Sequence, residues 1–304
     1  MILITGSAGL IGTALQAVLE NSAIEYRCFD IAESPLQDTR NEAAIEAALD
    51  GVTGVVHLAA ISRVVWAERD PSVAQAVNVG ALETLLGSMA RRSQSPWLIF
   101  ASSREIYGEQ PHLPVGEDAD LLPINTYGRT KLAGEDLVNE AREAGVLAQI
   151  VRFSNVFGST DDHSDRVVPA YARASAHGGA IRVDGADNTF DFTHVSDVAD
   201  GLFKLVEATR AGERLPPIHF LTGRGTSLGQ LADMAVEHAR QPVAVNHAPE
   251  RDFDVSHFYG DPARAKALLD WEARVPIDQG FAQLVDDFSK IPAEQGEASH
   301  RRCN

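Results

Sequence analysis

Short apolar runs alternate with amphipathic stretches through the first half of the chain. The apolar runs predict strands at 1–5, 25–29, 54–58, 97–101 and 147–152, and helical periodicity predicts helices at 10–20, 40–49, 72–92 and 126–144. Further along, we expect strands at 181–183 and 218–221 and helices at 195–208, 228–239 and 262–269. This alternation predicts an α/β fold with a doubly wound parallel sheet covered by helices on both faces.

The second half of the chain has a different texture. From about residue 158, loops rich in Gly, Asp and Pro separate shorter elements. We expect residues 1–157 to form the sheet domain, with segments near 186–212 returning to it, and residues 158–291 to form mainly a smaller, discontinuous C-terminal lobe. Residues 292–304 are polar and lack periodicity, so we expect a flexible tail there.

Composition narrows the possible classes. The chain has 304 residues, of which 44% are hydrophobic, enough to bury a substantial core. Its apolar runs are far shorter than the roughly 20 residues that cross a bilayer, so we expect no membrane partner. The formal charge of −17 makes nucleic acid a poor partner. Cys28 and Cys303 fit neither a disulfide framework nor a metal site, and the first residues lack a basic leader region. We expect a cytoplasmic protein without bound metal.

Three glycines follow the first predicted strand. Gly6, Gly9 and Gly12 have the spacing G-x-x-G-x-x-G and open the predicted helix 10–20. Glycine permits a sharp turn and a close approach of the backbone to a pyrophosphate, whose charge then faces the amide end of the helix. A glycine triplet alone is a weak signal, but the strand before it and the helix after it are the context of a Rossmann dinucleotide site. We expect a nicotinamide dinucleotide to bind here.

Asp30 closes the second predicted strand. A carboxylate there can accept hydrogen bonds from the adenosine ribose and would repel a 2′-phosphate, so the sequence predicts NAD in preference to NADP. The alternative is that Asp30 only ends a strand and starts a turn.

Tyr127 and Lys131 are four residues apart on the predicted helix 126–144, so they share one face. A neighbouring ammonium group, helped by a positive nicotinamide, would lower the phenol pKa from about 10 and make Tyr127 a general base. Such a pair is common by chance on solvated helices. Ser102 and Ser103 strengthen the catalytic interpretation, because they follow the predicted strand 97–101 at the edge where open α/β sheets bind ligands.

With these residues the chain resembles the extended short-chain dehydrogenase/reductases, specifically the nucleotide-sugar epimerases and dehydratases. The resemblance covers about residues 1–285. Its markers are 5–12, 38–42, 57–60, Asn78, 102–108, 127–131, 152–158 and 191–195.

The resemblance implies roles for individual residues. Its cofactor-binding residues are Gly6, Gly9, Leu10, Ile11, Gly12, Asp30, Asp38, Leu58, Ala59, Ala60, Asn78, Tyr127 and Lys131. Within this set, Asp38 would contact adenine and Lys131 would also bind the nicotinamide ribose. Ser103 would hydrogen-bond the reacting sugar oxygen while Tyr127 removes the proton of that hydroxyl and hydride moves to NAD.

The implied substrate site is less complete. By the resemblance, Asn155 would donate to a diphosphate, Val168 within the segment 167–169 would border the nucleobase, and Arg251 would bind phosphate. Arg251 could instead pair with Asp252 or Asp254 at the surface.

Phe190 stands where relatives carry an arginine, so one usual phosphate contact is missing. Phe190 would stack on a base or ribose or simply pack. Arg166 and His163 are candidates to supply the missing charge. The short link between strand 25–29 and Asp38 also leaves little room for a helix that many relatives have there.

The pair Arg104-Glu105 bears on the reaction. Related 4,6-dehydratases often carry Asp-Glu here, and the loss of the Asp disfavours that type. Glu105 keeps a dehydratase or decarboxylase possible as a catalytic acid–base residue. Arg104 would either recognise a carboxylate, as on a uronic acid, or form a structural ion pair with Glu105.

The leading hypothesis is an NAD-dependent nucleotide-sugar 4-epimerase that acts on a UDP-hexose or UDP-uronic acid through a transient 4-keto sugar. The alternatives are a dehydratase or decarboxylase that uses Glu105, and a non-catalytic NAD-binding regulator. Relatives commonly dimerise through two helices of each subunit, so we also expect a homodimer formed by helices 72–92 and 126–144.

Overall fold

The computed structural model describes residues 1–251 and 255–293. A central sheet of six parallel strands has the order β2-β1-β3-β4-β5-β9. Its strands are β1 (Ile2–Thr5), β2 (Tyr26–Phe29), β3 (Gly54–His57), β4 (Trp97–Ser103), β5 (Ala148–Phe153) and β9 (Ile218–Phe220). The chain runs from β1 outward to β2 and then crosses to β3 on the other side of β1, so the strand order reverses between β1 and β3. Ligands of open α/β sheets bind at the carboxyl ends of the strands beside such a point. The predicted fold class is confirmed.

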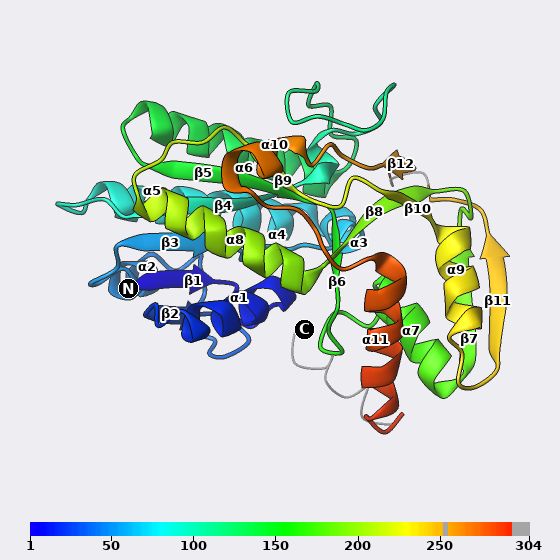
Figure 1. Cartoon of the computed structure of the whole chain (residues 1–304). Coiled ribbons are helices and arrows are strands. Elements are labelled where there is room, and N and C mark those ends of the chain that lie inside the picture. Colours follow the sequence, from blue (N-terminus) through cyan, green and yellow to red (C-terminus); the bar gives the residue numbers. More distant parts are fainter. Residues whose placement is uncertain (252–254, 294–304) are drawn as a thin grey trace.

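Helices cover both faces of this sheet (Figure 1). On one face α1 (Leu10–Asn21) packs against α8 (Val195–Arg210), and on the other lie α2 (Glu42–Ala48), α5 (Ala81–Ala90) and α6 (Thr126–Glu143). Leu15 and Leu202 are fully buried on the first face, and Leu82 and Val138 on the second. Burial of each such leucine stabilises the fold by roughly 2 kcal/mol. Two separate apolar cores therefore hold the sheet rigid beneath its carboxyl edge.

The segment between β3 and β4 is more broken than its sequence predicts. It forms α3 (Val64–Arg69), α4 (Pro71–Gln75), a π-helical turn η1 (Ala76–Gly80) and then α5, where the periodicity predicts one helix over 72–92. Within η1 the side chain of Asn78 donates to the Thr130 hydroxyl at 2.9 Å and accepts from the backbone N–H of Ile61 at 2.7 Å. These tertiary hydrogen bonds accompany a local change of helical register that single-helix periodicity does not reveal.

The smaller lobe contains its own sheets and core. Strand β8 (Thr189–His194) pairs with β6 (Asn155–Phe157), β10 (Gly225–Ser227) and β12 (His257–Phe258), and β7 (Gly179–Asp184) pairs with β11 (Val243–Ala248). Three helices surround them: α7 (Val167–His177), α9 (Leu228–Glu237) and α11 (Ile277–Ser289). Figure 1 shows these helices beside the end of the central sheet, while α10 (Ala263–Leu269) packs back on β9 and α8. The lobe thus stands next to the carboxyl ends of the sheet strands.

Among the described residues, no helix is both long and apolar enough to cross a membrane.

Candidate active site

The turn between β1 and α1 has the geometry of a dinucleotide cradle. Gly6 has φ +74°, and a Cβ atom there would lie 2.6 Å from the backbone nitrogen of Ala59. A Cβ atom on Gly12 would overlap the carbonyl oxygen of Gly6. Gly9 is the N-cap of α1, and no side chain caps the helix there. The backbone amides at this end of the 12-residue helix fit a pyrophosphate, and Leu10 and Ile11 anchor the helix start against the core.

Asp30 follows β2 and fastens this turn. Its carboxylate oxygens accept hydrogen bonds from the backbone N–H of Ala8 at 3.0 Å and of Ala32 at 2.9 Å. A carboxylate has about four lone-pair positions, so it retains capacity for ribose hydroxyls. The strand-end role and the cofactor role are therefore compatible.

The other predicted cofactor residues differ in their surroundings. Leu58, Ala59 and Ala60 are half-buried directly after β3. Asp38 is half-buried and holds Arg40 through paired hydrogen bonds, which lower the pKa of its carboxyl group. Asn78 donates both its amide hydrogens to protein groups, the second to the Ile61 carbonyl at 3.2 Å. It therefore positions the turn after β3 and has no N–H left for a cofactor.

Ser103, Tyr127 and Lys131 meet at the carboxyl end of β4. Ser103 is the last residue of β4, which is longer than its apolar run predicts because Ser102 and Ser103 continue the pairing with β5. Its hydroxyl accepts from the backbone N–H of Glu105 at 3.2 Å and lies close enough to the phenol of Tyr127 to lower the pKa of that group. Lys131 Nζ donates to the Ala101 carbonyl at 2.8 Å and lies 5.9 Å from the centroid of the Tyr127 ring. The three predicted side chains thus lie together at the end of β4.

Burial dominates the titration of both side chains on α6. It raises the pKa of Tyr127 to about 12, against smaller opposing effects of the Ser103 hydrogen bond and of the Arg166 and Arg104 charges. Burial also lowers the pKa of Lys131 to about 8. The prediction that the neighbouring ammonium lowers the phenol pKa is not met by the protein alone. A positive charge brought by the cofactor is the remaining means of lowering it.

Arg104 and Glu105 form a buried ion pair beside this group. Arg104 Nη2 lies 2.7 Å from one carboxylate oxygen of Glu105, and both side chains are more than nine-tenths buried. The second carboxylate oxygen accepts from the side-chain N–H of Asn125 at 2.7 Å. The expected ion pair is present, and it lies close to the site, because both charges influence the pKa of Tyr127.

Two further arginines lie near the site, Arg166 directly before α7 and Arg63 directly before α3. Arg166 precedes α7 and contacts the Ser62 hydroxyl at 3.3 Å and a carboxylate oxygen of Asp162 at 3.5 Å. Arg63 lies 2.8 Å from a carboxylate oxygen of Asp165, and burial lowers its pKa. The predicted residue Arg166 therefore lies near Tyr127, whereas His163 packs edge-on against Trp66 at 4.9 Å.

The other predicted substrate residues differ in their placement. Asn155 begins β6 and is half-buried. Val168 is 2% exposed and its side chain packs in the core of the smaller lobe, so the expectation that the segment 167–169 borders a base stays a prediction for its backbone and its neighbours. Phe190 on β8 packs edge-on against Phe192. Arg251 is exposed, and its predicted partners Asp252 and Asp254 lie outside the described residues.

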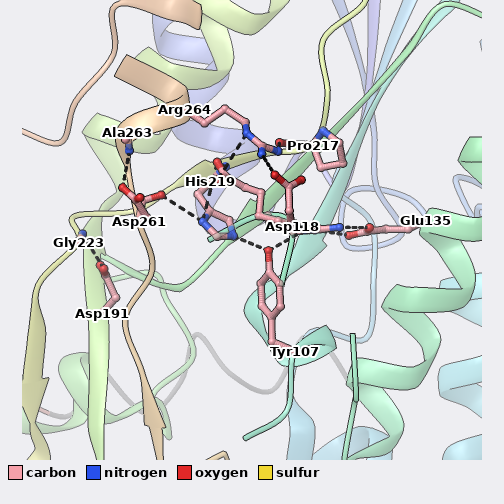
Figure 2. Close-up of polar contacts among 12 residues, drawn as sticks. Tyr107, Asp118, Glu135, Asp191, Pro217, His219, Gly223, Asp261, Ala263 and Arg264 are labelled. Carbon is pink, nitrogen blue, oxygen red and sulfur yellow. Dashed lines mark hydrogen bonds and ion pairs between the residues drawn. The ribbon is translucent and has the colours of Figure 1, made fainter. Parts of the chain in front are cut away.

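A buried polar network supports the loop after Ser103 (Figure 2). The Tyr107 hydroxyl accepts from Arg152 Nη1 at 2.6 Å and lies 2.6 Å from His219 Nε2, while His219 Nδ1 faces the Asp261 carbonyl at 3.3 Å. These partners specify a neutral ring protonated at Nδ1, and burial lowers the pKa of His219 to about 3. Arg152 also makes two hydrogen bonds to Glu135, so the network ties the loop after β4 to β5, β9 and α6.

Two residues of the site escaped the sequence analysis. Asn125 accepts from the backbone N–H of Gly128 at 2.8 Å, so it caps α6 as well as holding Glu105. An asparagine directly before a predicted helix is a recognisable capping signal. Phe258 lies beside Arg104, with 5.6 Å between the guanidinium carbon and the ring centroid. A lone phenylalanine near a loop offers no comparable signal.

Comparison with known proteins places this arrangement in context. The sequence matches the family described as NAD dependent epimerase/dehydratase over residues 2–219. It is 26% identical to a UDP-glucose 4-epimerase of Corynebacterium glutamicum, over 98% of both chains. The structure of a UDP-glucose 4-epimerase with UDP-glucose from Thermotoga maritima superposes with a TM-score of 0.86, at 26% identity over 95% of this chain and 98% of that one. MoeE5 in complex with UDP-glucuronic acid and NAD gives a TM-score of 0.84, at 26% identity over the same shares.

Proposed function

Because the chain belongs to the NAD dependent epimerase/dehydratase family, as its sequence motifs predict, we propose that it is a nucleotide-sugar 4-epimerase acting on a UDP-hexose or UDP-uronic acid. NAD as the cofactor agrees with the family and with the NAD-bound structures of similar chains. The observation that carries the proposal is the meeting of Ser103, Tyr127 and Lys131 at the carboxyl end of β4, the sheet edge that also holds the glycine turn after β1.

The residues divide the proton chemistry between them. NAD, when bound, supplies reversible acceptance of hydride from the sugar carbon. Tyr127 takes the proton from the C4 hydroxyl as that carbon is oxidised and returns it after the keto sugar has presented its other face. Ser103 orients the same oxygen through its hydroxyl. Lys131 is held by the Ala101 carbonyl and places a positive charge near the phenol of Tyr127.

The position of Glu105 favours epimerisation over dehydration or decarboxylation. Abstraction of a C5 proton requires a carboxylate that can move to that carbon, which Glu105 could do only by breaking its present polar contacts. In this site one oxygen of Glu105 is paired with Arg104 and the other accepts from Asn125. A regulator without catalysis, the other alternative, would have no use for Ser103, a buried Tyr127 and Lys131 at one point.

The test is incubation of the NAD-saturated protein with UDP-glucose and with UDP-glucuronate, followed by mass spectrometry and NMR of the sugar. A 4-epimer of unchanged mass is expected from at least one of them. Loss of water or of carbon dioxide would instead indicate a dehydratase or a decarboxylase that uses Glu105. An unaltered sugar in both reactions would contradict the proposal that the protein is an enzyme.

We further propose a cytoplasmic homodimer. The helices expected to pair two subunits lie together on one face of the sheet, where α3, α4 and α5 all contact α6. Trp66 on α3 and Val73 on α4 are partly exposed apolar side chains beside this group. Light scattering coupled to size exclusion should give twice the mass of the 32.7 kDa chain. A monomeric mass at micromolar concentration would contradict the dimer.

A further inference from the structure

Arg104 holds an unusual position for a charged side chain. It follows Ser103 directly, and its guanidinium carbon lies 4.8 Å from the ring centroid of Phe190 and 5.6 Å from that of Phe258. These rings belong to β8 and β12 of the smaller lobe, whereas Arg104 follows the last residue of β4. The guanidinium therefore lies where the central sheet meets the smaller lobe, one residue from the catalytic serine. Contact with two aromatic faces limits the orientations that its plane can adopt.

The hydrogen bonds of this group are incomplete. Nη2 is paired with Glu105, but Nε and Nη1 have no hydrogen-bond partner among the described residues, although the side chain is only 8% exposed. An arginine side chain carries five N–H donors, and a buried donor without a partner is destabilising. The rings of Phe190 and Phe258 offer no oxygen or nitrogen acceptor. A planar guanidinium with open donors is suited to a two-oxygen anion.

An anion that binds Arg104 must lie close to the reacting carbon of the sugar. Arg104 is near enough to Tyr127 to lower the pKa of that phenol electrostatically. Glu105 is already paired with Arg104 through Nη2 and hydrogen-bonded by Asn125, so Nε and Nη1 are the donors left for a second oxyanion.

We propose that Arg104 binds an oxyanion of the nucleotide-sugar and determines which sugars the site accepts. This inference rests on the proposed function, because it assigns an atom group of that substrate. The oxyanion has two possible sources on one ligand: a carboxylate on the sugar ring, or the diphosphate that links sugar to nucleoside. In either case the oxygens of this group accept hydrogen bonds from Nε and Nη1. The two aromatic rings hold the guanidinium plane in one orientation.

The experiment is isothermal calorimetry on NAD-saturated protein with UDP, UDP-glucose and UDP-glucuronate as probes. The variant is Arg104→Met, which keeps an unbranched side chain but removes charge and donors. Because it leaves Glu105 buried without its cation, the double variant R104M/E105Q is measured beside it. Arg182→Met is the matched control, since Arg182 is 71% exposed on β7 and pairs with Asp184.

We expect Arg104→Met and the double variant to weaken binding roughly tenfold to hundredfold, the range for hydrogen bonds to a charged group. Weakening confined to UDP-glucuronate assigns the sugar carboxylate, and equal weakening of all three probes assigns the diphosphate. NAD affinity and the Arg182→Met protein should be unchanged.

Unchanged affinity for every probe in the double variant would overturn the proposal, as would an equal loss of NAD affinity, which indicates general damage to the site. These readouts need no turnover. If the wild-type protein binds the probes but produces no epimer, the proposed function fails while the assignment of Arg104 still stands or falls on affinity.

Discussion

The turn between β1 and α1 and the surroundings of Arg104 lie at the same edge of the central sheet, yet they are built from different groups. The turn offers backbone amides, and its shape is fixed by glycines whose added Cβ atoms would meet backbone at Ala59 and Gly6. Around Arg104 the polar groups are long side chains, each beside a carboxylate: Arg104 with Glu105, Arg166 with Asp162 and Arg63 with Asp165.

This difference bears on how each part can change. The backbone geometry of the turn cannot be changed by one substitution without moving the turn itself. In contrast, replacement of a single long side chain can move a charge while the fold stays intact. The cofactor contacts are therefore tied to the fold, and the substrate contacts are tied to individual side chains. Each of the following substitutions acts on one part and should leave the other intact.

Tyr127→Phe should have the largest effect. Loss of the phenol hydroxyl removes the proposed general base while the buried ring remains, so kcat for epimerisation should fall roughly 10²- to 10⁴-fold. NAD affinity, measured by fluorescence titration, should change less than about threefold, because the glycine turn is untouched. A variant that keeps more than a tenth of the wild-type kcat would exclude Tyr127 as the base.

Gly6→Ala should damage the cofactor turn. Its φ of +74° and the 2.6 Å distance from the added Cβ to Ala59 N predict a loss of unfolding free energy of about 3 kcal/mol and a weaker affinity for NAD. Gly87→Ala is the control, because its Cβ atom would meet only the end of the Arg91 side chain, at 3.6 Å. Denaturant unfolding and NAD titration of both variants measure the difference; equal losses would show that the turn has no special requirement.

Much of the cofactor part could be predicted from the sequence because its signals are local. A strand, three glycines and a helix follow one another within 2–21, and Asp30 comes directly after the next strand. Helix α11 belongs to the smaller lobe, but it carries a local signal as well, because Phe281, Leu284 and Phe288 are buried on one face. No helix is predicted there.

The substrate part depends on contacts between distant segments, which spacing does not encode. The ring that lies under Arg104 belongs to residue 190, and the second belongs to residue 258. Nothing near Arg104 in the sequence indicates either contact. The burial of the Val168 side chain is hidden for the same reason, since an apolar residue can face a ligand or fill a core, and tertiary packing places this side chain in the core.

His219→Gln should reveal a pH-dependent cost in the buried network. The pKa of His219 is about 3 in the fold, against about 6.5 in an unfolded chain, so the unfolded state alone takes up a proton as pH falls below about 6.5. Between pH 7 and pH 5 this uptake lowers the wild-type unfolding free energy by about 2 kcal/mol. Glutamine can still accept from Tyr107 but does not titrate, so the variant should lose about 2 kcal/mol less over the same interval. Parallel stability curves in urea would contradict this.

Asp30→Asn should give the smallest change. It tests whether the turn between β1 and α1 also depends on charge, because Asp30 is the charged side chain that holds this turn. Asparagine can still accept from the Ala8 N–H but no longer repels a 2′-phosphate, so NADP affinity should rise roughly tenfold while NAD affinity changes little.

Glu33→Gln removes an exposed carboxylate three residues away and should leave the ratio of the two affinities unchanged. If Asp30→Asn also leaves that ratio unchanged, the choice of cofactor resides in the shape of the turn, and the contrast with the charge-based substrate part becomes sharper. If Glu33→Gln shifts it equally, general surface charge governs the choice, and the cofactor part is less distinct from the substrate part than its backbone geometry indicates.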